Sequence, residues 1–520
     1  MSTRRDLAQL LVPVVHWTPG RGFADARPGI DAALELGVGG FQLVGGEQDV
    51  VRALAKDLQI KSKHRLLIAA DLERGAGQQF SGATGLPPLA AIVALGDIES
   101  LRRAARLTAR EARTMGVNWN LAPVCDLDLL AENPIVGTRS MGSDARAVAT
   151  LVTAWIEACQ AEGVLACAKH FPGIGRVTND PSLTLPVIAF AADQLKEQDL
   201  HPFRAAISAG VASMMTAHVA YTALDSSGEP ATLSREMLQW LLRQQLKYDH
   251  LIVSDALTMA GVLQGHDVAR AAVLALRAGC DVLLDPGNLE STLDALERAA
   301  SDGTLEPERI RQAMRRRLKW AQWASPPNDW RRPSGADTAW GALLADRVLR
   351  VTSGPLPALG TVTEVVIVDD DIDVNTAMVA TTALSDALRA GGHDARDASE
   401  PTVASGGPLV IGLFSDYLPM KSRSTLLPSS VARVRDLVEH GARTPARRHC
   451  GGVRRPAIRG AAALRGANAR RVERRSGDAA GGSASAAQDA QGVVGQRHLT
   501  LDTAISSAIG PAATSRRQSR

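Results

Sequence analysis

The sequence predicts an α/β protein made of a (β/α)8 TIM barrel, a smaller, partial α/β sandwich domain and a disordered tail. Short apolar runs alternate with amphipathic helical segments up to about residue 290, as parallel strands joined by crossover helices do. The runs number eight, which is the strand count of such a barrel. Polar residues stand at the ends of most runs, where barrels gather their functional groups. The alternation alone also allows an open doubly wound sheet.

The predicted strands are short and mostly apolar, and each is followed by a segment with helical periodicity. Apolar residues recur at i, i+3 and i+4 in segments such as 97–116 and 235–248, which predicts helices that bury one face. The eight predicted strands lie within residues 10–15, 40–45, 66–71, 117–124, 164–171, 211–218, 251–256 and 281–285.

The composition changes along the chain and predicts the domain boundaries. Residues 1–325 form the predicted barrel, and a Pro-rich, polar linker at 326–345 leads into a second, partial α/β pattern at 346–441. Arg, Ala and Gly dominate residues 442–520, which contain no aromatic residue. Such a segment has little to bury and is predicted to be disordered. Its abrupt start resembles translation of GC-rich DNA in a wrong frame, and a basic arm that binds nucleic acid is the alternative.

Composition and charge narrow the choice of partners and compartment. The formal net charge of +3 is too small to indicate a nucleic-acid partner. The five cysteines contain no C-x-x-C pair, which favours reduced thiols and a cytoplasmic location. The apolar stretch near the N-terminus is broken by Pro13 and lacks a cleavage site, so no signal peptide is predicted. No run reaches the roughly 20 residues that cross a bilayer, so no membrane partner is predicted.

Charged and polar residues recur at the predicted strand ends. Asp71, Glu73 and Arg74 follow the third strand, and Asp126 and Asp128 follow the fourth. Lys169 and His170 end the fifth strand, His218 ends the sixth and Asp255 ends the seventh. Any one of these could merely cap a helix or a turn, but five strand ends in register indicate a shared site. The histidines show no metal-ligand spacing, so neither a metal nor a cofactor is predicted.

Several motifs together resemble glycoside hydrolase family 3, in particular its bacterial β-N-acetylglucosaminidases (β-hexosaminidases). The resemblance runs in order over roughly residues 5–320. It rests on "DLERGAGQQF" (71–80), "NLAPVCDLD" (120–128), "NPIVGTRSMG" (133–142), "KHFPG" (169–173), "TAHVAYTALD" (216–225) with "PATLS" (230–234), and "IVSDALTMAGV" (252–262). The second domain resembles, more weakly, the α/β sandwich domain that many members of this family carry.

The resemblance implies a retaining glycosidase that removes terminal β-N-acetylglucosamine from cell-wall glycans, as in peptidoglycan recycling. It implies that Asp255 is the nucleophile, and that Asp71, Arg139, Lys169 and His170 line the sugar subsite. His218 also matches a family position and joins the predicted substrate-binding residues. In isolation, Asp255 could instead cap a helix, Arg139 could form a surface salt bridge, and His170 could be a core histidine. A carbohydrate substrate is then the expected partner; the aglycon and the oligomeric state stay open.

The loop after the fifth strand departs from the family pattern. Relatives usually carry Asp-Ser-His or Asp-Thr-His there, in which the His is the acid/base, whereas this chain has Asp180, Pro181 and Ser182. A serine hydroxyl cannot replace an imidazole as a general acid. Asp180 is the predicted catalytic substitute, because a carboxyl with a raised pKa can donate a proton. Gln79 and Ile174 also depart, standing where many relatives have Arg and His. A glycan-binding pseudoenzyme and an N-acetylglucosaminide phosphorylase on the same scaffold are the alternatives.

Overall fold

The computed structural model describes most of the first two thirds of the chain and parts of the rest. The described residues are 4–324, 333–348, 363–369, 383–390, 393–397, 409–414, 428–443 and 451–454.

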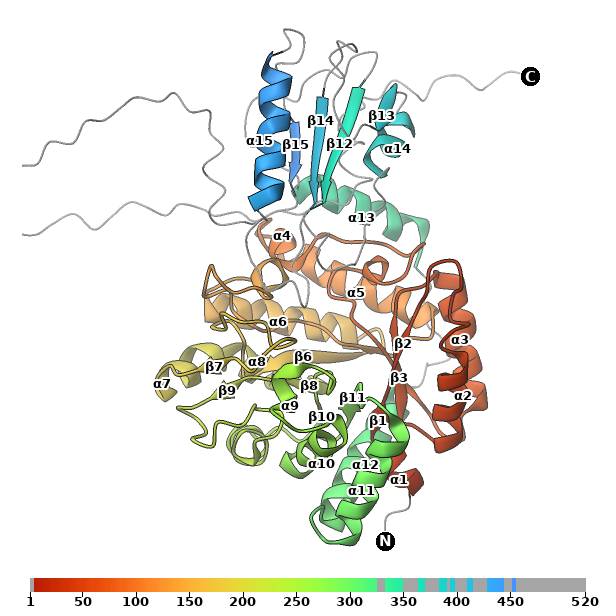
Figure 1. Ribbon diagram of the computed structural model, residues 1–520, viewed down its shortest axis with the longest axis vertical. Coiled ribbons are helices and arrows are strands. Elements are labelled where there is room, and N and C mark those ends of the chain that lie inside the picture. The colour runs from red at the N-terminus through yellow and green to blue at the C-terminus, as the bar shows by residue number, and fades with distance from the viewer. Residues whose placement is uncertain are drawn as a thin grey trace, which may run out of the picture.

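A curled sheet of parallel strands forms the centre of the first part of the chain (Figure 1). Its strands follow one another in chain order: β2 (Val14–His16), β3 (Gly40–Val44), β4 (Leu67–Ala70), β5 (Trp119–Asn120), β6 (Leu165–Phe171), β8 (Ser213–Thr216) and β10 (Leu251–Val253). All neighbours in this sheet pair in parallel.

Two further pairings connect the ends of this sheet. β1 (Leu11–Val12), separated from β2 by Pro13 alone, pairs in parallel with β11 (Leu283–Leu284). A bridge between Val253 and Val282 links the end of β10 to the start of β11. Each of the eight predicted runs contains a described strand, so the α/β class and the curled parallel sheet are confirmed.

Helices connect the strands and cover the outside of the sheet. Several begin at side-chain caps, because Asp97, Asp144, Asp267 and Asn288 each accept a backbone N–H two or three residues further on. The connecting helices are α1 (Arg4–Ala8), α2 (Arg27–Leu36), α3 (Gln48–Lys61), α4 (Leu89–Val93), α5 (Ile98–Thr114), α6 (Ala145–Gln160), α7 (Ala192–Gln194), α8 (His201–Ser208), α9 (Ala260–Leu263), α10 (Val268–Ala278), α11 (Leu289–Ser301) and α12 (Pro307–Trp323). Shorter 3-10 helices lie at Ala76–Gln78 and Gly137–Arg139, π-helices at Leu195–Asp199 and Glu236–Gln245, and the short strands β7 (Val187–Ile188) and β9 (Ala220–Tyr221) pair in parallel.

The inside of the curled sheet is a packed core that α12 closes at one end. Trp320 and Ala321 of α12 join the inward-facing strand residues, among them Trp119. The Trp119 indole N–H donates to Ser213 Oγ at 2.8 Å, which satisfies its one polar atom inside this core. Arg317 of α12 donates to the carbonyl oxygens of Gly39 and Arg65, each at 2.6 Å, just before β3 and β4 begin. Burial lowers the pKa of Arg317 to about 10.

A second, smaller sheet lies in the C-terminal part of the chain. Its parallel strands run in the order β13 (Ala395–Asp397), β12 (Thr363–Asp369), β14 (Leu409–Phe414) and β15 (Gly451–Arg454), together with helices α14 (Ala383–Ala390) and α15 (Pro428–Arg443). β15 falls inside the segment 442–520, whose composition predicts no further strand. Residues 455–520, with most of the predicted tail, lie outside the described residues.

Helix α13 (Gly335–Val348) begins inside the predicted linker at 326–345 and packs on the first domain beside α4 and α5 (Figure 1). Trp340 is 9% exposed and Leu344 is fully buried. The Arg103 guanidinium of α5 lies 4.6 Å from the centre of the Trp340 ring, so the contact combines apolar burial with a cation–π interaction. The predicted boundary therefore cuts through a helix that belongs to the packing of the first domain.

Trp340→Ala should lower the free energy of unfolding of the first domain by about 3–5 kcal/mol, because it empties a buried aromatic site. Leu343→Ala on the same helix is the matched control, since Leu343 is 59% exposed and its loss should change stability by less than about 0.5 kcal/mol. Urea unfolding of the full chain, followed by tryptophan fluorescence and circular dichroism, measures both. Equal losses in the two variants would show that α13 is not docked through Trp340.

Candidate functional site

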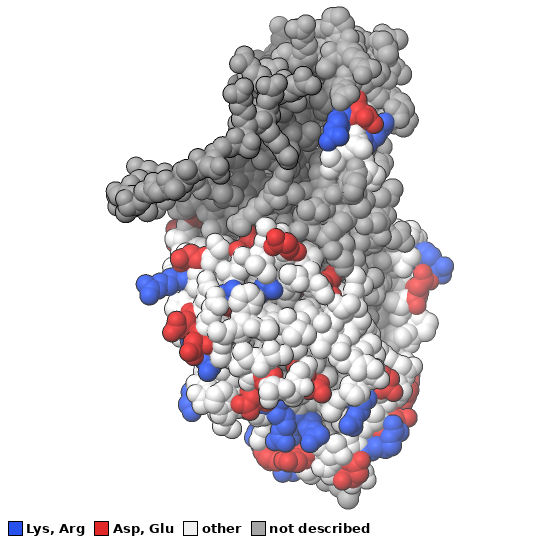
Figure 2. Space-filling model, turned by 60° about the vertical axis from the view of Figure 1, so that its left-hand side comes forward, with Lys and Arg blue, Asp and Glu red and all other residues white. Residues whose placement is uncertain are grey.

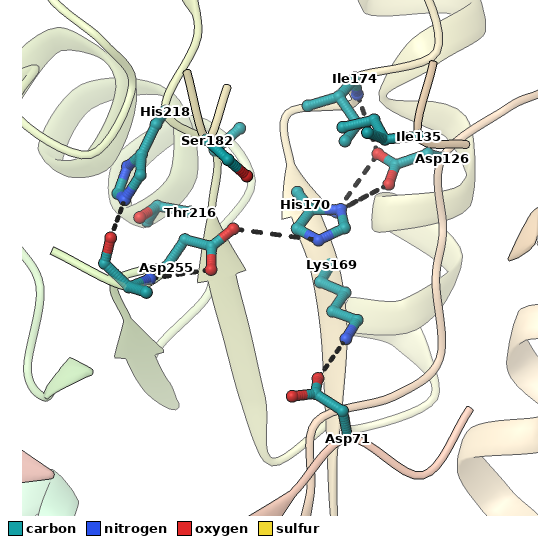
Figure 3. Close-up of polar contacts among 12 residues, drawn as sticks. Asp71, Asp126, Ile135, Lys169, His170, Ile174, Ser182, Thr216, His218 and Asp255 are labelled. Carbon is teal, nitrogen blue, oxygen red and sulfur yellow. Dashed lines mark hydrogen bonds and ion pairs between the residues drawn. The ribbon is translucent and has the colours of Figure 1, made fainter. Parts of the chain in front are cut away.

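A buried ammonium group, that of Lys169, lies between two carboxylates at the carboxyl ends of β4 and β6, and Figure 3 shows its contact with one of them, Asp71. Lys169 Nζ lies 2.6 Å from Asp71 Oδ1 and 2.8 Å from Glu73 Oε1. The Lys169 side chain is only 2% exposed, so its charge depends on these two partners rather than on water. Lys169 and Asp71, both predicted from the sequence, are thereby brought together from strands that are about a hundred residues apart.

Arg139 completes this cluster from the segment that follows β5. Its guanidinium makes a two-pronged contact with Glu73, at 3.0 Å from Nε to Oε2 and 2.8 Å from Nη2 to Oε1. Burial alone would raise the pKa of Glu73, but Arg139 and Lys169 outweigh it and hold that pKa well below its usual range. Asp71 Oδ2 also accepts from Gln42 Nε2 at 2.7 Å. The cluster thus holds two cations and two anions.

His170 is oriented by Asp126, a carboxylate with no solvent exposure. Asp126 Oδ2 lies 2.7 Å from His170 Nδ1, and the same carboxylate accepts the backbone N–H groups of His170 and Ile174. A carboxylate at Nδ1 leaves Nε2 to face the site. Nε2 lies 4.0 Å from Oδ2 of Asp255 (Figure 3).

Asp255 follows β10 and faces the imidazole of His170. Its Oδ1 accepts the backbone N–H of Ala256 at 2.8 Å. Burial would raise the pKa of Asp255, but His170 and the Ala256 N–H lower it below the usual carboxyl range. Asp255 is therefore a carboxylate at neutral pH, the form that a nucleophile requires.

His218 lies behind Asp255 and supports its backbone. Its Nε2 lies 3.0 Å from the carbonyl oxygen of Ala256, which can only accept, so Nε2 carries the proton. Nδ1 then accepts from the Thr232 hydroxyl at 2.8 Å. Burial lowers the pKa of His218, which favours this neutral form. The predicted substrate-binding residue His218 thus uses both ring nitrogens on protein groups.

Asp180 and Ser182 form a tight turn in the loop after β6. Asp180 is 2% exposed, and its Oδ1 accepts the backbone N–H of Ser182 at 2.8 Å, which is an Asx turn. The Pro181 and Ser182 carbonyl oxygens accept from the backbone N–H groups of Gly261 and Ala260 in α9. The turn is therefore docked on the helix that follows Asp255, and Ser182 lies beside Asp255 and His218 in Figure 3.

Glu73 and Asp126 belong to the candidate site but were not predicted as site residues from the sequence. Gln79 and Ile174, which depart from the family pattern, each contact a backbone or side-chain group in this region. Glu73 and Asp126 were visible only as acidic residues at strand ends, and their pairing with Lys169 and His170 identifies them. Gln79 Oε1 accepts the backbone N–H of Gly45 at 3.1 Å. Ile174 is 2% exposed and contributes a backbone donor to Asp126.

Neither a cluster of metal-binding side chains nor a membrane-spanning helix occurs among the described residues. Nowhere in that part of the chain do three or more His, Cys, Asp or Glu side chains gather as metal ligands would. Within the same residues, no helix combines the length and apolar character needed to cross a bilayer. Cys125, Cys159, Cys167 and Cys280 are buried free thiols, and burial raises the pKa of each of them.

The comparisons with known proteins agree with the motifs. A family model described as "Glycosyl hydrolase family 3 N terminal domain" matches residues 7–319. A "Beta-N-acetylglucosaminidase/beta-glucosidase" of Cellulomonas fimi is 36% identical over 292 residues, which are 54% of this chain and 52% of that protein. A "Beta-hexosaminidase" of Thiobacillus denitrificans is 38% identical over 239 residues, 45% of this chain and 66% of that protein. The chain thus spans about half to two thirds of the length of these relatives.

Among solved structures, a glycoside hydrolase family 3 β-N-acetylglucosaminidase from Paenibacillus is similar with a TM-score of 0.68 and 27% identity. The match covers 85% of this chain and 83% of that one. The family predicted from the motifs is confirmed, with nearly the same extent as the predicted residues 5–320.

Lys169→Met should lower the free energy of unfolding by about 3–5 kcal/mol, because it removes the cation that the buried carboxylate of Glu73 and the partly exposed carboxylate of Asp71 share. Lys61→Met is the control: Lys61 forms a surface pair with Asp57 at 3.1 Å and its side chain is 46% exposed, so its loss should cost less than about 1 kcal/mol. Urea unfolding of both variants tests this. A Lys169→Met variant as stable as the Lys61→Met variant would mean that the cluster is hydrated in solution.

Proposed function

We propose, because the chain belongs to glycosyl hydrolase family 3, that it is a retaining β-N-acetylglucosaminidase with a weakened proton donor. Relatives named beta-hexosaminidase and beta-N-acetylglucosaminidase support the choice of sugar. The observation that carries the proposal is the carboxylate of Asp255, ionised and held 4.0 Å from the carboxylate-supported imidazole of His170. Asp71, Lys169 and Arg139 lie in the adjoining charged cluster.

The proposed reaction has two displacements at the anomeric carbon. In the first, an oxygen of Asp255 bonds to that carbon while the bond to the leaving oxygen breaks, and that oxygen departs either as an anion or after taking a proton. In the second, a water oxygen bonds to the same carbon, the bond to Asp255 breaks and returns its electron pair to the carboxylate, and the proton that the attacking water loses passes to solvent. The two inversions together retain the β configuration.

The charged cluster is suited to hold the non-reducing sugar. The side chains of Asp71 and Arg139 are 28% and 20% exposed, whereas those of Lys169 and Glu73 are nearly buried beneath them. Asp71 can accept and Arg139 can donate hydrogen bonds to neighbouring hydroxyl groups, and charged partners make such bonds stronger. Lys169 and Glu73 fix the two exposed groups in place.

Proton transfer to the leaving oxygen is the weak step of this proposal. Ser182 stands where relatives carry the acid/base His, and Asp180 uses a carboxylate oxygen in the turn that presents Ser182. A missing general acid slows such reactions by roughly 10²–10⁴-fold when the leaving group is poor. The natural substrate is assigned, within this proposal, to glycans derived from the cell wall, and the compartment to the cytoplasm.

The proposal extends to the architecture. We assign residues 1–325 to a (β/α)8 TIM barrel, supported by the pairing of β1 with β11 and the bridge between Val253 and Val282. The sheet of β12 to β15 supports a partial α/β second domain, which was predicted at 346–441 and to which β15 (Gly451–Arg454) adds a strand beyond that range.

Asp255→Asn should abolish hydrolysis of 4-nitrophenyl β-N-acetylglucosaminide, because an amide cannot form the covalent intermediate. Asp249→Asn, at a site 83% exposed, controls for charge loss and should retain full activity. Release of nitrophenolate is the assay, and circular dichroism verifies folding. More than a few per cent of wild-type activity in Asp255→Asn would remove Asp255 from the nucleophile role.

Ser182→His should raise turnover of N,N′-diacetylchitobiose by about tenfold or more, and turnover of the nitrophenyl glycoside far less. In the Ser182→His variant, kcat/KM should also fall as the pH rises above about 6.5, the pKa of an unperturbed imidazole, because the acid then loses its proton. In the wild type, kcat/KM should stay flat between about pH 5 and 8, because Asp255 is already ionised over this range. The combined Pro181→Ser, Ser182→His variant tests whether Pro181 restricts the loop.

Equal, brisk wild-type turnover of both substrates would show that Asp180 or another group is already a competent acid. N-acetylglucosamine 1-phosphate formed in phosphate buffer would assign phosphorolysis in place of hydrolysis. Binding of N-acetylglucosamine with no turnover of either substrate would leave a glycan-binding protein.

A further inference from the structure

A chain of hydrogen bonds runs from the end of β8 to the backbone beside Asp255. The Ala256 carbonyl oxygen can only accept, so His218 Nε2 donates to it at 3.0 Å. Burial lowers the pKa of His218, so the ring is neutral and its Nδ1 accepts from the Thr232 hydroxyl at 2.8 Å. The Thr232 oxygen in turn accepts from the Thr216 hydroxyl at 2.8 Å. The direction of each bond in the chain is therefore set by the acceptor at its end.

The Thr232 hydroxyl has a second acceptor in reach, the Ala217 carbonyl oxygen at 3.1 Å. Its single proton can go to only one of the two, and donation to Ala217 would leave an oxygen lone pair facing His218 Nδ1 unless the ring took a second proton. Unlike the surface charges that Figure 2 shows, His218 is only 1% exposed and Thr232 is fully buried. Burial opposes a charged ring more strongly than Asp255 favours it, so Thr232 donates to His218.

This chain of hydrogen bonds ends on the residue that orients the Asp255 carboxylate. Ala256 is held at both of its backbone groups, because its N–H donates to Asp255 Oδ1 at 2.8 Å and its carbonyl oxygen accepts from His218. Oδ1 is thereby occupied, and the other carboxylate oxygen, Oδ2, faces His170 at 4.0 Å (Figure 3). A nucleophile that is held in one orientation reacts faster than one that must first find it.

We propose that His218 and Thr232 are positioning residues: His218, a neutral ring locked in one tautomer by Thr232, orients Asp255 so that its Oδ2 attacks the anomeric carbon. This inference rests on the proposed function. It gives His218 a role other than binding substrate, because both ring nitrogens are used on protein groups and the side chain is almost fully buried. Thr232 acts through His218, and Thr216 acts through Thr232.

Two substitutions of His218 separate the donated N–H from the rest of the ring. A glutamine can place its own Nε2 where His218 donates to Ala256, whereas a leucine fills the space without a donor. With 4-nitrophenyl β-N-acetylglucosaminide, His218→Leu should lower kcat by about 5- to 100-fold, the rate equivalent of one unmade buried hydrogen bond. KM should stay within about twofold, and His218→Gln should recover most of the lost kcat. A rise in KM at unchanged kcat would show that His218 binds the sugar and would overturn the inference.

The role of Thr232 is tested by removing its hydroxyl and then restoring it. Thr232→Val should lower kcat by about 3- to 30-fold, because Nδ1 of His218 loses its donor, and Thr232→Ser should stay within about threefold of the wild type. The control variant is Thr108→Val: Thr108 is 2% exposed and donates its hydroxyl to the Ala104 carbonyl oxygen within α5, so kcat should not change. Equal losses of kcat in Thr232→Val and Thr108→Val would remove Thr232 from the positioning role.

Nitrogen NMR of the full chain, labelled at histidine, tests the ring directly, and the His218→Gln variant identifies its resonances. We expect a proton on Nε2 alone from about pH 6 to 8, and a proton on Nδ1 in this range would overturn the inference. An active wild type with an equally active His218→Leu variant would overturn this inference alone. A wild type that does not cleave the nitrophenyl glycoside would instead overturn the proposed function and, with it, the catalytic role of His218.

Discussion

The site depends on the charge of Lys169, which is buried and must be balanced where it lies. Asp71 and Glu73 supply that balance from the end of β4, and Arg139 supplies a second cation from the segment after β5. A buried charge that loses its partner costs several kcal/mol, so three distant parts of the chain are tied to one geometry. Only the outer members, Asp71 and Arg139, keep enough exposure to meet a ligand. The same ion pairs that stabilise the fold therefore present the hydrogen-bonding groups of the sugar subsite.

Asp126 is the buried charge that positions His170, the residue that faces Asp255. Its carboxylate accepts the backbone N–H groups of His170 and Ile174 as well as orienting the imidazole. It thus couples the segment after β5 to the first turn of the loop after β6. On the opposite side, His218 is fixed between Thr232 and Ala256 and supports the backbone that presents Asp255. The separation of His170 from Asp255 is consequently set by buried carboxylate and carbonyl acceptors rather than by mobile surface groups.

Much of the fold and part of the site could be predicted from the sequence. The eight apolar runs located every strand of the first sheet, because strand length and periodicity are local properties. Asp71, Lys169, His170 and Asp255 could be listed as candidates because each stands near the end of a predicted strand, and parallel strand ends meet at one edge; the roles proposed for them come from the family resemblance. The roles of Glu73 and Asp126 could not be predicted, since Glu73 resembles Arg74 as a loop charge and Asp126 resembles Asp128 until the partners are known. The strand β15 was likewise missed, because its four residues carry no apolar periodicity and gain their pairing from β14.

The replacement of a histidine by Ser182 is compatible with an intact site because the loop does not depend on that side chain. The turn is made by the Asp180 carboxylate and the backbone N–H of Ser182, and it docks through the Pro181 and Ser182 carbonyl oxygens on α9. Each of these contacts is available to any residue at position 182 that has an ordinary backbone. A change there alters which proton can be donated while leaving Asp255, His170 and the charged cluster where they are.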